Sequence, residues 1–113
     1  MKRVFTCLFL AITMMFSLIS VSASISVPER TSDTTWVMDY ANVLSASTES
    51  HIQDYSQLLA DEYSASITVV TVDFVTGSID QYALAIFNKW QLGDKDLQNG
   101  VLLLLSIGDD DYY

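Results

Sequence analysis

Two stretches of the chain carry apolar side chains at the spacing of a helix. Between positions 46 and 63, and again between 79 and 90, they recur at steps of three, four and four residues, which places them on one face of an amphipathic helix. Ser45 is predicted to cap the first helix, and Ser78 with Gln81 is predicted to form a capping box on the second. Gly93 is predicted to end the second helix as a C-cap glycine. The stripes, which we expect in the core rather than around a ligand, are Ile52, Tyr55, Leu59 and Tyr63, and Ile79, Tyr82, Ile86 and Trp90.

Two uninterrupted apolar runs predict strands. SITVVTV at 66–72 is β-branched almost throughout and VLLLLSI at 101–107 is mostly aliphatic, so both are typical of strands buried on both faces. With the second helix between them they form a βαβ unit with parallel strands. The apolar run in 101–107 is therefore expected to be a central strand that is covered on both sides. The carboxyl ends of the strands, where open α/β sheets bind ligands, carry Asp73 and Asp109 to Asp111.

The first 23 residues have the pattern of a secretory signal. A short basic start is followed by an apolar run at 4–20, and small residues precede a cleavage point after Ala23. An uncleaved membrane anchor is the alternative, although the run is short for the ~20 apolar residues that a bilayer requires. We therefore expect an exported protein, periplasmic, extracellular or membrane-anchored, that begins at Ser24. Residues 24–35 hold the only proline and are predicted to form an extended lead-in.

Charge and cysteine content narrow the function classes. The chain has 5 basic and 14 acidic residues, and loss of Lys2 and Arg3 with the signal leaves 3 against 14. Such a surface excludes nucleic acid and anionic membrane surfaces as partners, since both need basic patches, and leaves a divalent cation or a basic protein. Cys7, the only cysteine, also leaves with the signal, so no thiol chemistry is expected in the mature chain.

Oxygen-bearing side chains gather in the loop before the second strand. Asp94, Asp96 and Asn99 offer the hard oxygen ligands that calcium prefers, between two glycines. The spacing is not that of an EF-hand, because glycine comes one position late and Leu105 stands in place of the bidentate glutamate. The alternative is a polar turn in which the Asp and Asn side chains bond only the backbone.

Short motifs follow one another in a fixed order: Val37-x-Asp39-Tyr40-Ala41-x-Val43-Leu44-Ser45, a β-branched strand, Asp80-x-Tyr82-Ala83, Phe87-x-x-Trp90-x-Leu92-Gly93, and Asn99-Gly100-Val101-Leu102-Leu103-Leu104. Together they resemble the TPM domain of exported bacterial proteins and of a thylakoid protein of plants. The resemblance implies an α/β/α sandwich around a small mixed sheet over residues 36–113. It also implies calcium binding and acid phosphatase activity in some members, and a role in membrane-protein or photosystem maintenance in others.

The resemblance also bears on the ends of the domain and on its site. The family domain continues with a further strand, so the chain is expected to be truncated at its C-terminus. The missing C-terminal region could associate the protein with a membrane. Asp39 becomes a candidate ligand or catalytic carboxylate. Asp73 and the loop before the second strand are expected at opposite ends of the sheet, and Asp39 fits either end. The candidate metal ligands are Asp39, Asp73, Asp94, Asp96 and Asn99.

The residues give little support to phosphatase chemistry. A cysteine-dependent mechanism needs a thiolate and an arginine, and the mature chain has no cysteine and only Arg30, in the lead-in. Asp109-x-Asp111 follows an apolar strand, but three aspartates at a hairpin are typical of a solvated turn. His51 lies off the helical stripe and is expected to be exposed. No catalytic residue is assigned.

Two functions therefore stand as expectations. The first is an exported, acidic, calcium-binding interaction module in envelope or membrane-protein maintenance. The second is a metal-dependent acid phosphatase in which Asp39, Asp73 and the acidic loop hold the metal.

Overall fold

The computed structural model describes residues 24–113, so the predicted signal and its cleavage point lie outside the described part of the chain. Six elements follow in the order β1 (Val37–Asp39), α2 (Ala46–Tyr63), β2 (Ser66–Val72), α3 (Ile79–Trp90), β3 (Gly100–Ser106) and β4 (Asp111–Tyr112). Neither of these helices is both long and apolar enough to cross a bilayer.

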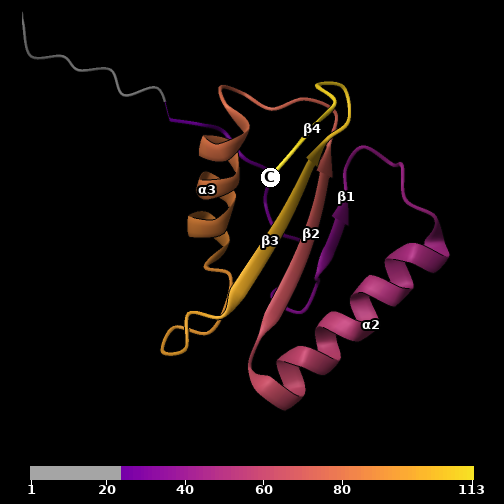
Figure 1. The fold of residues 1–113 in the computed structure, drawn as a ribbon, viewed down its shortest axis with the longest axis vertical. Coiled ribbons are helices and arrows are strands. Elements are labelled where there is room, and N and C mark those ends of the chain that lie inside the picture. Colours follow the sequence, from indigo (N-terminus) through magenta and orange to yellow (C-terminus); the bar gives the residue numbers. More distant parts are fainter. Residues whose placement is uncertain (1–23) are drawn as a thin grey trace, which may run out of the picture.

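The four strands form one mixed sheet in the order β1-β2-β3-β4 (Figure 1). β1, β2 and β3 are parallel, and β4 returns antiparallel to β3, where Leu105 faces Tyr112. The predicted βαβ unit with parallel strands is confirmed, and the predicted α/β/α sandwich around a small mixed sheet is present. The return strand that was expected beyond Tyr113 begins at Asp111.

The helix boundaries agree with the periodicity, but two of the caps differ. Ser45 caps α2 as predicted, because its hydroxyl accepts the backbone N–H of Thr48 at 3.2 Å. Ser78 makes no side-chain cap to α3, so the predicted capping box is wrong. Gln91, not Gly93, takes the left-handed conformation that ends α3, with φ of 50°. The helix therefore ends at the residue that directly follows Trp90. Gly93 lies two positions further on, where its backbone contacts Gly100.

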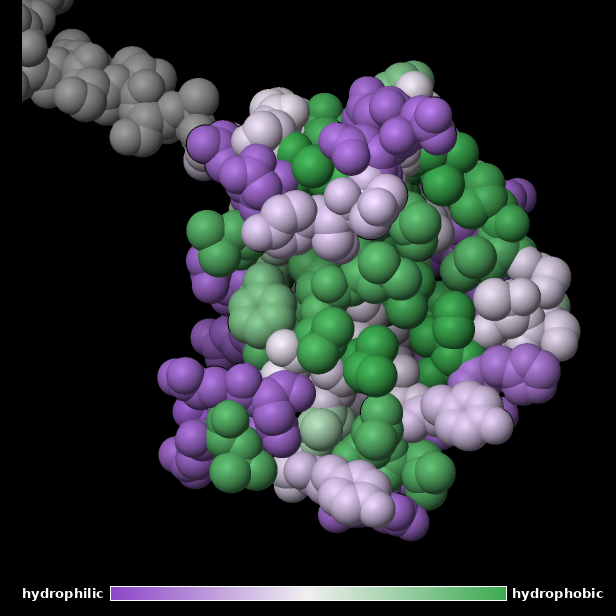
Figure 2. Space-filling model, in the orientation of Figure 1, coloured by the Kyte–Doolittle hydropathy of each residue, from purple (hydrophilic) through white to green (hydrophobic). Residues whose placement is uncertain are grey.

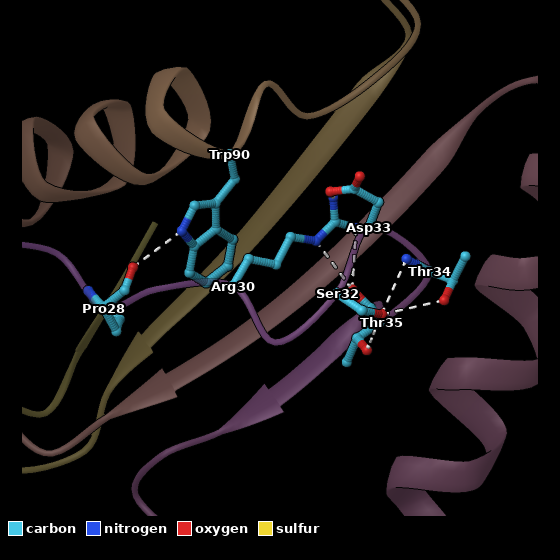
Figure 3. Close-up of polar contacts among 7 residues, drawn as sticks. All are labelled: Pro28, Arg30, Ser32, Asp33, Thr34, Thr35 and Trp90. Carbon is cyan, nitrogen blue, oxygen red and sulfur yellow. Dashed lines mark hydrogen bonds and ion pairs between the residues drawn. The ribbon is translucent and has the colours of Figure 1, made fainter.

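The core lies between the sheet and α3. Val70, Ile86 and Leu104 are completely buried, and the lead-in contributes to the same cluster through Val27. The indole N–H of Trp90 donates to the carbonyl of Pro28 at 3.0 Å (Figure 3). The lead-in has no helix or strand, as predicted, but it is part of the packed structure.

The other face of the sheet is only partly covered. α2 packs against β1 and β2, and β3 lies beside it with Val101 at 55% and Leu103 at 40% exposure. Figure 2 shows hydrophobic side chains gathered over the strands beside α2. The expectation that β3 is covered on both sides is therefore wrong, because a single helix on this face does not reach the third strand.

The predicted face of α2 is rotated from the one that packs. Ser56 is the buried residue of the helix, whereas Tyr55 is 68% and Tyr63 is 65% exposed. The polar neighbours Gln53 and Gln57 contact the residue before β1: they accept hydrogen bonds from the backbone and indole N–H groups of Trp36. The apolar stripe therefore lies along the flank of α2 that borders β3.

Candidate functional site

Asp39 organises the carboxyl end of β1. Its carboxylate accepts the backbone N–H groups of Val43 at 3.1 Å and Leu44 at 2.8 Å, together with the hydroxyl of Thr71. Thr71 is completely buried in β2, and its hydroxyl oxygen accepts the N–H of Ala41 at 3.2 Å. The carboxylate therefore folds the loop that leads into α2 and ties it to the neighbouring strand.

These contacts set the charge state of Asp39. Partial burial alone would raise the pKa of this carboxyl, but the hydrogen bonds from Thr71, Leu44 and Val43 outweigh it and hold the pKa below its ordinary value. Asp39 is thus a charged, hydrogen-bonded carboxylate at neutral pH. A group in this state is a poor proton donor, and its oxygens are already occupied by donors within the fold.

Asp109 plays the same part at the end of β3. Its carboxylate accepts the hydroxyl of Ser106 at 2.6 Å and the backbone N–H of Val75 at 3.0 Å, and these bonds lower its pKa. The N–H of Gly108 donates to the carbonyl of Asp73 at 2.6 Å. The hairpin is thus tied to the loop after β2. Sequence analysis treated Asp109 to Asp111 as a solvated turn; the Ser-x-x-Asp spacing was the signal that could have identified Asp109.

The loop before β3 lies at the opposite end of the sheet. Asp94 accepts the backbone N–H groups of Asp96 at 2.8 Å and Leu97 at 2.9 Å, which lowers its pKa, and Asn99 accepts the N–H of Asp94 at 3.2 Å. These are the Asx-turn contacts of the polar-turn alternative. A Cβ on Gly93 would come within 2.5 Å of the backbone nitrogen of Gly100, so the two glycines close the loop by direct backbone contact.

The five predicted metal ligands therefore divide between two ends of the sheet. Asp39 and Asp73 lie at the carboxyl ends of β1 and β2, while Asp94, Asp96 and Asn99 precede β3. Within residues 24–113, no three Asp, Glu, His or Cys side chains are grouped closely enough to hold a metal ion. Among the five, hydrogen bonds join only the loop residues, from the N–H of Asp96 to Asp94 and from the N–H of Asp94 to Asn99.

Arg30 is the arginine on which phosphate binding would depend, but it forms hydrogen bonds with the backbone before β1. Its guanidinium donates to the carbonyl of Thr35 at 3.0 and 3.3 Å, with Asp33 at 3.9 Å (Figure 3). It also lies 5.0 Å from the ring of Trp36. Burial lowers the pKa of Arg30, although Asp33 opposes this effect. The guanidinium lies before the start of β1, whereas Asp39 is at its carboxyl end. His51 is exposed on α2, as predicted.

Comparison with known proteins finds a matching family model and a similar fold. The family model of the TPM domain matches residues 37–113. Among solved structures, the N-terminal domain of a protein from P. gingivalis, determined in solution by NMR, is similar with a TM-score of 0.60 and 23% identity. The similarity covers 68% of this chain and 50% of that one, so the chain spans half the length of this structural relative. No curated protein matches the chain significantly.

Proposed function

Because the chain belongs to the TPM domain family, we propose that it is an exported, acidic interaction module that acts in envelope or membrane-protein maintenance by binding a basic protein partner. The observation that carries the proposal is the imbalance of surface charge. Residues 24–113 contain 14 acidic side chains against Arg30, Lys89 and Lys95. Arg30 is held by Thr35 and Trp36, and Lys89 pairs with Glu29 at 2.6 Å.

Hydrogen bonds favour the charged form of three carboxylates of this surface. Hydrogen bonds lower the pKa of Asp94 and Asp109, and that of Asp80 at the start of α3. The resulting negative field favours association with lysine- and arginine-rich surfaces and weakens as salt screens it. The contacts of Asp39 and Arg30 support binding rather than catalysis. Both side chains form hydrogen bonds with backbone groups that stabilise the fold.

A paired binding and hydrolysis measurement tests the proposal. A lysine-rich peptide should bind the purified protein with an affinity that falls as salt rises, and a neutral peptide of the same length should not bind. Hydrolysis of a phosphate ester at acid pH, with and without divalent metal, should equal that of Asp39→Ala. Metal-dependent turnover in wild type that is lost in Asp39→Ala, with circular dichroism showing that the variant is folded, would instead support the alternative, an acid phosphatase.

We further propose that the loop from Asp94 to Asn99 binds calcium weakly. The supporting observation is the Asx turn, because backbone donors fix the charged Asp94 carboxylate in place as outer-shell groups fix metal ligands. Asp96 and Asn99 add oxygens in the same loop, and backbone carbonyls and water complete calcium shells elsewhere. Asp39 and Asp73, at the other end of the sheet, form the competing location.

Melting temperature against added calcium tests this site. At about 100 times the dissociation constant, calcium should stabilise the protein by about 2.7 kcal/mol, which is several degrees for a domain of this size. The shift should be lost in Asp94→Asn and retained in Asp73→Asn and Asp39→Asn. An equal shift with magnesium would argue against a calcium site, and a shift lost only in Asp73→Asn would move the site to the carboxyl ends of the strands.

A further inference from the structure

A pocket of about 250 Å³ lies beside the start of β2, at the end of the sheet opposite Asp39. The lead-in, the last turn of α2, the start of β2 and the turn after α3 all contribute to its wall. Its polar lining includes Arg30, Ser66 and Asp94, which come from three different segments of the chain. We call it the Arg30 pocket.

Arg30 brings to this pocket a positive charge that the fold neutralises only weakly. Its side chain is 11% exposed, and the carboxylate paired with it, that of the fully exposed Asp33, lies 3.9 Å away. Burial lowers the pKa of Arg30, so the loss of water outweighs the attraction of Asp33. Nε and Nη2 donate to Thr35 (Figure 3), whereas Nη1 makes no hydrogen bond within residues 24–113. A guanidinium in this state favours a carboxylate, which it can bind through two parallel hydrogen bonds.

Ser66 supplies a buried hydroxyl that the fold leaves without a partner. The residue is 4% exposed, and its Oγ forms no hydrogen bond in the part of the chain that the structure describes. Side chains alternate along a strand, so Ser66 lies on the same side of β2 as Val70, which packs in the core with α3. An unpaired buried hydroxyl is destabilising. An oxygen of a ligand in the Arg30 pocket would give Ser66 the partner that the fold does not provide.

Asp94 and the net charge select the kind of carboxylate. Asp94 lines the same pocket, and its charged form is favoured by hydrogen bonds from the backbone of Asp96 and Leu97. Residues 24–113 carry 14 acidic side chains against 3 basic ones, so a ligand with net negative charge, such as phosphate, is repelled. A ligand that carries both a carboxylate and an ammonium group has no net charge and complements Arg30 and Asp94 together.

We propose that the Arg30 pocket binds a small zwitterion, a free amino acid, with its carboxylate on Arg30 and Ser66 and its ammonium group on Asp94. The pocket is smaller than those that take drug-sized ligands, which suits a molecule of this size. Trp36, Ala60 and Ala65 provide an apolar part of the wall for the side chain of the ligand. The proposal is independent of the proposed function, because neither a basic partner nor calcium is needed for it.

Calorimetric titration of the purified protein with free L-amino acids tests the class of ligand. The buffer is free of calcium, because Asp94 is also the proposed calcium ligand. At least one amino acid should bind with a dissociation constant of about 1 mM or tighter. The matching amine without the carboxylate, and the matching acid without the amino group, should each bind about tenfold or more weakly. Absence of binding by every amino acid, or equal binding of the matching acid or of inorganic phosphate, would overturn the proposal and leave the proposed function intact.

Conservative substitutions locate the site. Ser66→Ala removes a hydroxyl without a partner in the fold, so it should not lower the melting temperature, but it should weaken binding about threefold or more. Thr68→Val is the matched control, because Thr68 is also buried and unpaired but does not line the pocket, and binding should be unchanged. Arg30→Lys keeps the charge, loses the paired donors and should weaken binding about tenfold. Unchanged binding in Ser66→Ala or Arg30→Lys, or an equal loss in Thr68→Val, would overturn the proposal.

Discussion

Leu104→Ala should destabilise the protein far more than Leu103→Ala, although the two leucines are neighbours in β3. Leu104 is completely buried against α3, and truncation of such a side chain costs about 2–5 kcal/mol through lost burial and a cavity. Leu103 is 40% exposed on the other face, so its loss should cost about 1 kcal/mol or less. Each kcal/mol lowers the melting temperature of a domain this small by about 4–8 °C.

Urea titration of both variants measures the difference. The slope with denaturant should stay the same, so that the change in midpoint reports stability. Comparable losses at the two positions would contradict the exposure of Leu103 and restore the expectation of a strand covered on both sides.

Asp39→Ala should cost about 2–4 kcal/mol, since it removes the acceptor for two backbone N–H groups and leaves the buried hydroxyl of Thr71 without its carboxylate partner. The matched control is Asp96→Ala, in an exposed loop at the other end of the sheet. Thermal melts of the two variants at neutral pH make the comparison. A loss no larger than that of Asp96→Ala would mean that the loop from Asp39 to Leu44 folds without the carboxylate.

The contribution of Asp39 should also depend on pH. Its pKa in the folded protein lies below that in the unfolded chain, so the folded state holds the proton less tightly. The stabilisation is therefore complete above the unfolded value of about 4 and is lost as pH falls through the lower folded value. The stability gap between wild type and Asp39→Ala should close at acid pH.

Periodicity was sufficient for the long elements and failed where the chain is short. α2 has 18 residues and β2 has 7, and their boundaries were predicted from the helical spacing, the Ser45 cap and the β-branched run. β1 and β4 have 3 and 2 residues, too few for a period to be recognised, and they form only by pairing with a longer strand. The apolar stripe of α2 was identified from the sequence, but the strands against which α2 packs were not. Spacing along a helix does not indicate which strands the helix covers.

The carboxylates illustrate a second limit of sequence reasoning. Asp39 was selected by resemblance, but its partner Thr71 is 32 positions away and nothing local indicates the contact. Asp94 was different, since it accepts the backbone N–H groups of Asp96 and Leu97, two and three positions further on, and such Asx-turn contacts are local. Contacts within a few residues were therefore predictable, and those between strands required the fold.

Gly93 and Gly100 are in backbone contact, so the geometry of the sheet does not depend on the length of the loop between them. Their backbones touch, so the path from α3 into β3 is fixed at this crossing whatever lies between. The cost of closing a flexible loop rises by only about 0.6 kcal/mol for each doubling of its length. The four positions from Lys95 to Gln98 can therefore gain residues without altering the register of β3 against β2, because the carbonyl of Asn99 still accepts the N–H of Ser66. This part of the loop is a suitable place to insert a tag or a longer binding segment.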